Sequence, residues 1–300
     1  MKKIFYSILI FLLILFNFST VCADDVDNEV DFEDTIEVTA SNVSELPKTN
    51  SRRYIVYDRI SKSMIIGKNE DIKSAMASTT KIMTTIVILE KADLNEKVTV
   101  SAKAGGTGGS RLGLKRGDKA SVRDLLYGLM LRSGNDAAVA LAEHVGGSVK
   151  GFAELMNEKA IELGLTNTHF VTPHGLDDAN HYTTALELAK LTDYAMDNET
   201  FAKIVGTKST TIYINNQSRQ INNTNELLGV LNGVVGVKTG FTNNAGRCLV
   251  TETKRNNMDI ITIVLGADTK KDRTKDSVNL IEYTFSKYKM YNLEEQIIEE

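Results

Sequence analysis

Three short motifs bring together side chains that could perform nucleophilic acyl chemistry. Ser78-Thr79-Thr80-Lys81 places a serine hydroxyl and a lysine amine three residues apart, one turn from each other on a helix. A lysine can take the proton of a serine when desolvation and neighbouring cations lower its pKa from about 10.4. Ser133-Gly134-Asn135 offers a hydroxyl and an amide. Lys238-Thr239-Gly240 offers a cation and a hydroxyl to an anion, beside a glycine that a substrate backbone can approach.

Taken one at a time, these motifs are not specific. Ser286-Lys287-Tyr288-Lys289 repeats the first spacing on an amphipathic segment, and Ser277-Val278-Asn279 repeats the second. Serine, glycine and asparagine are also ordinary turn and capping residues. Lys238-Thr239-Gly240 occurs once, and its ordinary interpretation is a strand that ends in a turn. The motifs therefore gain weight only from their order and from the elements that carry them.

The helix that carries the first motif is predicted to be buried. Within Ser78–Ala92, apolar residues leave little polar face; they are Ile82, Met83, Ile86, Val87, Ile88 and Leu89. A helix that is apolar nearly all round lies at the centre of a domain. We therefore expect Ser78 at the core, next to the positive end of the helix dipole.

Strand patterns lie at both ends of the chain, around a middle of helical pattern. The expected strands are Arg53–Asp58, Ser63–Lys68, Gly233–Thr242, Arg247–Thr253 and Met258–Leu265. Residues from about 75 to 200 are helical in pattern, with N-cap signals at Ser121 and Thr184, and Asp272–Tyr288 closes the domain as a helix. We predict an α/β (α+β) fold: one antiparallel sheet flanked by helices, with an inserted all-helical lobe. The junction of sheet and lobe is the expected ligand site.

Composition and the N-terminal segment predict an exported globular protein. The 300 residues are 42% hydrophobic and 25% charged, and the net charge of −4 argues against nucleic acid as a partner. Two lysines, an apolar run and small residues make residues 1–23 a predicted signal peptide, cleaved after Ala23. An uncleaved anchor is the alternative, although the run is short for about 30 Å of hydrocarbon. Cys248, in an apolar stretch, is expected to be a buried small hydrophobe.

The rest of the chain divides into three predicted parts. Residues 24–47 are rich in Asp and Glu and are predicted to be a disordered linker. Residues 48–290 are the predicted folded domain, and residues 291–300 are a short acidic tail with no C-terminal β domain. Because this tail is too short and acidic to hold a membrane, membrane attachment would require the signal to stay uncleaved. The expected location is the extracytoplasmic cell surface or the medium.

The order of the three motifs is that of penicillin-binding proteins and β-lactamases. Four longer segments extend the similarity over about residues 50 to 290: Ala77–Thr84, Leu131–Glu143, Asn167–Asp178 and Lys238–Val250. On these segments the chain resembles a low-molecular-mass penicillin-binding protein, a serine-type D-alanyl-D-alanine carboxypeptidase of the peptidase S11 group. The resemblance implies a β-lactamase-like fold, which agrees with the sheet and helical lobe expected from the patterns.

The resemblance also implies roles for individual residues. Ser78 would be the nucleophile and Lys81 its general base, while Ser133 would relay a proton to the leaving amine and Asn135 would hold the substrate amide. The implied substrate-binding residues are Lys238, Thr239, Gly240, Phe241 and Arg273. Among them, Lys238, Thr239 and Arg273 would bind the terminal carboxylate, and the backbone N–H groups of Ser78 and Phe241 would form the oxyanion hole.

The implied partners are peptidoglycan stem peptides, with β-lactams as acylating inhibitors. A D,D-endopeptidase acting on peptidoglycan crosslinks would use the same residues. A class A β-lactamase needs a deacylating glutamate in an E-x-x-L-N segment, and after Glu162 the asparagine comes one place late, at Asn167. A non-catalytic wall-binding protein would be expected to lack a catalytic residue, and all are present. No cofactor or metal is expected; three histidines, at 169, 174 and 181, match no metal template.

Overall fold

The protein is described by a computed structural model over residues 45–288. The predicted signal peptide of residues 1–23, nearly all of the predicted linker of residues 24–47 and the predicted tail of residues 291–300 lie outside the described residues. Among residues 45–288, no helix has the length and apolar character needed to cross a bilayer.

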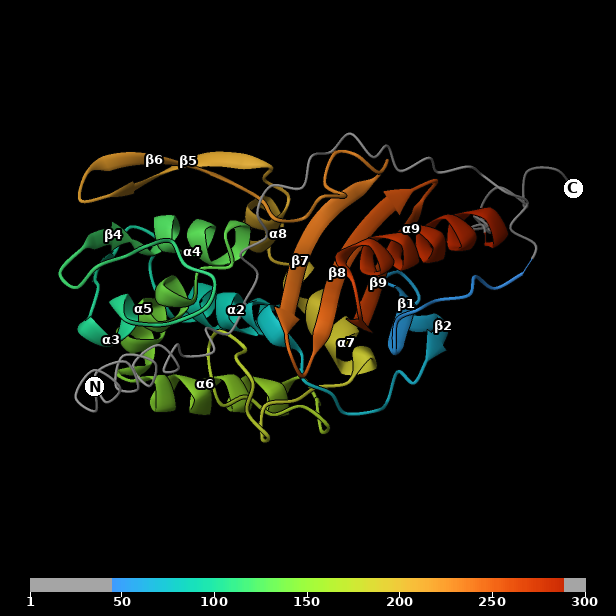
Figure 1. The fold of residues 1–300 in the computed structure, drawn as a ribbon, viewed down its shortest axis with the longest axis horizontal. Helices are drawn as coiled ribbons and strands as arrows, with labels where there is room; N and C mark the ends of the chain where they lie inside the picture. The colour runs from blue at the N-terminus through green and yellow to red at the C-terminus, as the bar shows by residue number, and fades with distance from the viewer. Residues whose placement is uncertain (1–44, 289–300) are drawn as a thin grey trace, which may run out of the picture.

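A five-stranded antiparallel sheet forms one half of the molecule (Figure 1). Its strands are β1 (Arg53–Asp58), β2 (Ser63–Lys68), β7 (Val234–Thr242), β8 (Gly246–Arg255) and β9 (Met258–Ala267). They lie in the order β2-β1-β9-β8-β7, so that the first strands of the domain complete a sheet begun by the last. The predicted antiparallel sheet and all five predicted strands are confirmed.

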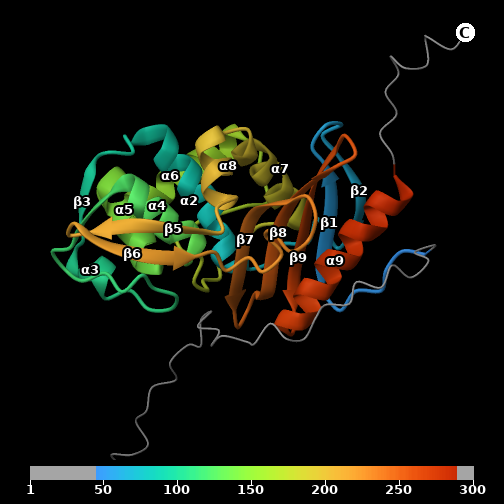
Figure 2. The ribbon, with the colours of Figure 1, turned by 90° about the horizontal axis from the view of Figure 1, so that it is seen from above.

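Both faces of this sheet are covered, which explains why its strands are nearly continuous apolar runs. On one face Val56 and Ile260 pack with Leu280 of α9 (Lys270–Lys287). On the other face Ile55 and Ile263 join the main core, against which α2 (Lys81–Lys91) and α7 (Ala185–Met196) pack. Figure 2 shows α9 along the outer side of the sheet and the lobe on the other side.

The inserted lobe is built mainly from helices. Besides α2 and α7 they are α3 (Ala102–Gly105), α4 (Val122–Leu131), α5 (Asn135–Gly146), α6 (Val149–Glu162) and α8 (Glu199–Val205). The apolar residues of α2 are fully buried at its centre, as predicted. The predicted caps are also present: Ser121 accepts a hydrogen bond from the Asp124 N–H, and Thr184 accepts one from the Glu187 N–H.

The lobe is not all-helical as predicted, because it also carries a small second sheet. This sheet has the order β3-β4-β5-β6, with β3 (Lys97–Thr99), β4 (Lys119–Ser121), β5 (Ser209–Ile214) and β6 (Gln217–Asn222). The first two strands have three residues each, too few to show a period of two. The last two alternate between exposed and buried residues and are joined by Asn215-Asn216, both at positive φ. That dipeptide between alternating runs is a hairpin signal that the sequence analysis did not use.

Candidate active site

Ser78 and Lys81 meet at the junction of sheet and lobe. Ser78 lies on a single 3-10 turn, η1 (Ala77–Thr80), and Lys81 is the first residue of α2. The Lys81 Nζ donates to the Ser78 Oγ at 2.8 Å, to the Asn135 Oδ1 at 2.7 Å and to the His174 carbonyl at 2.9 Å. None of these three acceptors is charged, and the Lys81 side chain is fully buried. The amine is therefore removed from water and in direct contact with the hydroxyl.

The turn that carries Ser78 is fixed from two sides. Ala77 has a φ of +48°, a strained conformation for a residue with a Cβ. The Thr80 hydroxyl donates to the Ala77 carbonyl at 2.8 Å and lies 2.7 Å from the His181 Nε2. Gly175 packs so closely that a Cβ there would lie 1.9 Å from the Ala77 oxygen. The loop of residues 167–183 thus holds the nucleophile's backbone in place.

Burial keeps two histidines of this loop neutral. Desolvation and the nearby Lys81 charge lower the pKa of His174 to about 3. Desolvation also lowers the pKa of His181 to about 4, and its Nδ1 accepts the Val171 N–H at 2.9 Å. Because Nδ1 is an acceptor, Nε2 carries the ring proton and donates to Thr80. Both histidines therefore act as hydrogen-bonding supports, and within residues 45–288 no group of His, Cys, Asp and Glu is arranged to hold a metal ion.

Ser133 and Asn135 lie on the bend between α4 and α5. Ser133, at a φ of +56°, is another non-glycine residue in the left-handed region, and its hydroxyl accepts from the Lys238 Nζ at 3.1 Å. The Asn135 side chain accepts from Lys81 and donates to the Gly108 carbonyl at 2.9 Å, while its backbone N–H donates to the Ser110 carbonyl at 2.7 Å. One bend therefore contacts the amines of both lysines.

Asp136 fastens a glycine-rich loop, residues 106–117, to this bend. Its buried carboxylate accepts the backbone N–H groups of Leu112, Gly113 and Leu114 at 2.9, 2.8 and 2.9 Å. The same loop supplies the two carbonyls that hold Asn135. The sequence analysis quoted Asp136 within a similar segment but gave it no role. The run of four glycines from 105 to 109, broken only by Thr107, was the available signal for this loop.

The strand β7 brings the third motif against the first two. The Lys238 Nζ contacts Ser133 and also donates to the Thr239 carbonyl at 2.9 Å. A Cβ at Gly240 would lie 3.0 Å from the Ser78 nitrogen, so only a residue without a side chain lets this strand pass so close to η1. The Thr239 hydroxyl lies 2.8 Å from that of Thr224, in the segment that returns from β6 to the sheet.

Five predicted residues, Ser78, Lys81, Ser133, Asn135 and Lys238, thus form one continuous set of contacts. Phe241 follows Gly240 on β7, and its ring lies under the Arg247 guanidinium at 3.9 Å. Arg273 is different: it is buried on α9, and its Nη2 is 2.6 Å from the Glu226 Oε1. The structure gives the predicted carboxylate-binding arginine an internal carboxylate as its partner.

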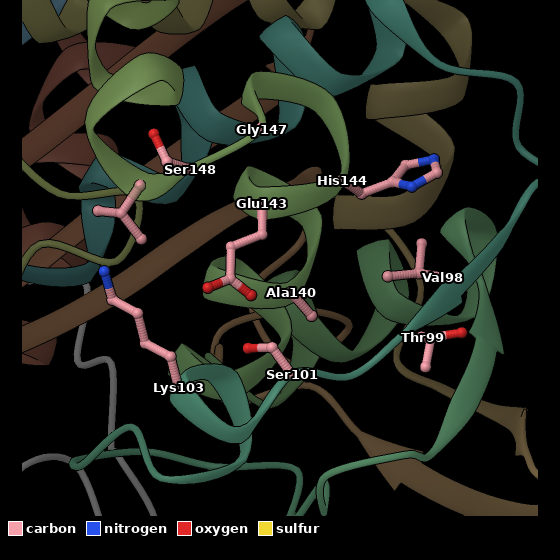
Figure 3. A pocket seen from close by; sticks show the side chains of 10 residues that line it. Val98, Thr99, Ser101, Lys103, Ala140, Glu143, His144, Gly147 and Ser148 are labelled. Atoms are coloured by element: carbon pink, nitrogen blue, oxygen red, sulfur yellow. The ribbon is translucent and has the colours of Figure 1, made fainter.

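A cavity of about 370 Å³ lies in the helical lobe and is separate from this set (Figure 3). Its walls come from β3, α3, α5 and the start of α6, and they include Lys103, Glu143 and His144. His144 is held by Glu96 at 2.7 Å. None of the residues predicted from the sequence lines this cavity.

Comparison with known proteins gives consistent matches. Residues 39–269 match the family Peptidase S11, described as D-alanyl-D-alanine carboxypeptidase. The chain is 37% identical over 245 residues to D-alanyl-D-alanine carboxypeptidase DacF of Bacillus subtilis, covering 80% of this chain and 63% of that protein. It is 38% identical over 237 residues to the D-alanyl-D-alanine carboxypeptidase of Streptomyces sp. K15, covering 73% and 81%. It therefore spans less than two thirds of the Bacillus relative.

Solved structures agree with these matches. The crystal structure of the Streptomyces K15 DD-transpeptidase has a TM-score of 0.76 and 34% identity, over 81% of this chain and 99% of that one. The carboxypeptidase DacD from Francisella tularensis has a TM-score of 0.77 and 30% identity, over 83% and 73%. These likenesses confirm the predicted fold class, in which an antiparallel sheet is flanked by helices and carries an inserted lobe.

Proposed function

Because this chain belongs to the peptidase S11 family of D-alanyl-D-alanine carboxypeptidases, as its sequence segments indicated, we propose that it removes the terminal D-alanine from peptidoglycan stem peptides. The reaction is a hydrolysis that passes through an ester of Ser78. The observation that carries this proposal is the contact of 2.8 Å between the buried Lys81 Nζ and the Ser78 Oγ.

Ser78 attacks the carbonyl between the two D-alanines, and Lys81 accepts the hydroxyl proton. The buried position of Lys81 and its three neutral acceptors support this role, because a lysine amine in such surroundings can act as a base. The backbone N–H groups of Ser78 and Phe241 stabilise the negative oxygen that develops, a contribution of several kcal/mol in acyl transfer. Close packing of Gly240 against η1 supports this pairing.

The C–N bond then breaks, and the leaving D-alanine takes a proton through Ser133. The contact of Ser133 with Lys238 supports this relay. Asn135 holds the substrate amide, and Lys238 and Thr239 bind the terminal carboxylate, to which an ammonium and a hydroxyl can both donate. Water finally attacks the Ser78 ester with Lys81 as base, which releases the shortened peptide and restores the enzyme.

This function places the substrate outside the cytoplasm, which agrees with the signal peptide predicted for residues 1–23. We propose that the protein is exported and that β-lactams acylate Ser78, because their strained amide presents a carbonyl and a carboxylate in a similar arrangement. The same machinery would cut a D,D-crosslink, so the natural substrate must be distinguished by product analysis.

The proposal is tested with the purified protein and a pentapeptide ending in D-Ala-D-Ala. We expect release of free D-alanine and stable labelling by a fluorescent penicillin, both abolished in Ser78→Ala. Ser286→Ala is the matched control, since Ser286 begins the repeated S-x-x-K spacing on α9, is exposed, and donates to the Tyr283 carbonyl. It should keep both activities.

Each alternative outcome has a distinct meaning. Rapid penicillin turnover without D-alanine release would indicate a β-lactamase. Labelling without pentapeptide cleavage, but with cleavage of a crosslinked dimer, would indicate an endopeptidase. A folded protein that neither cleaves nor is labelled would refute the serine acyl mechanism.

A further inference from the structure

The arginine expected to bind the substrate carboxylate is already neutralised from within. Arg273 lies in the first turn of α9, its side chain is 2% exposed, and its Nη2 donates to the Glu226 Oε1 at 2.6 Å. The Thr274 hydroxyl donates to the same oxygen. Glu226 is 8% exposed, so the pair is shielded from water and its two charges cancel at short range.

This pair lies a short step from the carboxylate end of the proposed site. Glu226 is two residues beyond Thr224, whose hydroxyl is 2.8 Å from the Thr239 hydroxyl. Two residues span at most about 7 Å. The Thr224 N–H also donates to the Leu131 carbonyl at 3.1 Å, which ties this segment to the end of α4 just before Ser133. The guanidinium is therefore in the neighbourhood of the group that receives the substrate's terminal carboxylate.

The geometry of the pair is incomplete for a purely structural ion pair. A carboxylate can accept two parallel bonds from the arginine fork. Here the Arg273 Nε and the Glu226 Oε2 are both buried and, among residues 45–288, have no hydrogen-bond partner. The neighbouring Asn225 Nδ2 is in the same condition. Donor capacity for an anion is thus present beside Thr239 and is only partly used by Glu226.

We propose that Glu226 is a specificity-determining residue: it competes, as an internal carboxylate, with the substrate's terminal carboxylate for the charge of Arg273. This inference deepens the proposed function and rests on it for the identity of the ligand. With Glu226 ionised, Arg273 gives the substrate little net attraction, and binding depends on Lys238 and Thr239. Removing the Glu226 charge leaves Arg273 with a positive charge that the substrate carboxylate can neutralise.

The test measures binding without chemistry, in a Ser78→Ala background, by calorimetry. The probes are one peptide ending in D-Ala-D-Ala with a free carboxylate and the same peptide ending in a carboxamide. Glu226→Gln keeps an acceptor for Thr274 and removes the charge. We expect about tenfold tighter binding of the carboxylate peptide, as for one gained charge-assisted hydrogen bond, and no change for the carboxamide.

Two further variants keep the test decisive. Glu226→Ala repeats it should the glutamine variant fail to fold, and Glu226→Gln with Arg273→Gln removes both charges and should return the carboxylate peptide to its original affinity. Asp276→Asn is the matched control, because Asp276 is a buried carboxylate on the same helix that is held by Ser51, and it should change neither affinity.

The outcomes separate this inference from the proposed function. Unchanged or weaker binding of the carboxylate peptide by the Glu226 variants, equal tightening of both peptides, or no binding of either peptide would overturn the role of Glu226. Activity is measured separately on the protein with Ser78 intact. A lack of D-alanine release there would refute the proposed function, while the comparison of carboxylate and carboxamide affinities would still decide whether Glu226 competes for Arg273.

Discussion

Asp136→Asn should detach the glycine-rich loop of residues 106–117 from the bend that carries Asn135. The wild-type carboxylate accepts three backbone N–H groups of this loop, at residues 112, 113 and 114, and also the N–H of Ala137. An asparagine keeps one acceptor oxygen and turns an NH₂ group toward the remaining donors. At least one buried loop N–H then loses its acceptor.

The cost follows from these contacts. A buried donor without a partner costs about 1–3 kcal/mol, and each bond that no longer ends on a charge loses about 1 kcal/mol. We expect the free energy of unfolding to fall by about 3 kcal/mol, which lowers the Tm by roughly 10 °C for a domain of this size. Because the loop holds Asn135 through the Gly108 and Ser110 carbonyls, D-alanine release should also fall by about tenfold or more.

Calorimetry gives the Tm, and hydrogen exchange at the amides of residues 112–114 reports on the loop directly. Asp118→Asn is the matched control: its carboxylate accepts the Lys115 N–H and the Asn215 Nδ2 at the exposed end of the same loop. It should cost less than about 1 kcal/mol. Unchanged Tm, exchange and activity in Asp136→Asn would refute the view that this carboxylate holds the loop.

Two other predictions follow from the site's surroundings. Gly240→Ala places a Cβ 3.0 Å from the Ser78 nitrogen and should lower the rate of acylation by penicillin far more than it lowers the Tm, since strand and nucleophile must separate slightly; equal rates would show that the close contact is unimportant. In urea titrations from pH 7 to pH 4, stability should fall as the pH drops below 6.5, because His174 and His181 stay neutral when folded, with pKa values of about 3 and 4, whereas the unfolded chain takes up their protons, by about 1.4 kcal/mol per pH unit for each. Burial and Asp259 raise the pKa of Glu252 to about 7, which favours the folded state between about pH 4.5 and 7 as the pH falls, so Glu252→Gln should make the acid loss steeper; a flat titration would contradict this assignment.

The sequence predicted the elements that have strong periodicity or a clear apolar run. The strands of the large sheet and the buried α2 follow directly from such runs, since each is covered on every side. The small sheet was missed because β3 and β4 are too short for any period to show. The position of Ser78 on a 3-10 turn was also missed, since tertiary contacts from Gly175 and His181, not local propensity, set that backbone.

The candidate site followed from motif order, whereas its supports did not. Order along the chain cannot reveal that Asp136 gathers three loop amides or that Thr224 touches Thr239, because these contacts join segments whose own patterns are those of ordinary turns. The prediction for Arg273 was drawn from the resemblance alone. Its pairing with Glu226 depends on how the 223–233 segment crosses the end of the sheet, which no local pattern specifies.

The strand order has a consequence for the timing of assembly. β1 pairs with β9, with Arg53 opposite Leu265, and η1 needs β7 beside it before Gly240 can meet Ser78. A chain that emerges from its N-terminus therefore exposes Ser78 and Lys81 long before the strands that complete their surroundings. Contacts between such distant segments form late in folding. The reactive serine remains unarmed for as long as the polypeptide is being threaded through a pore.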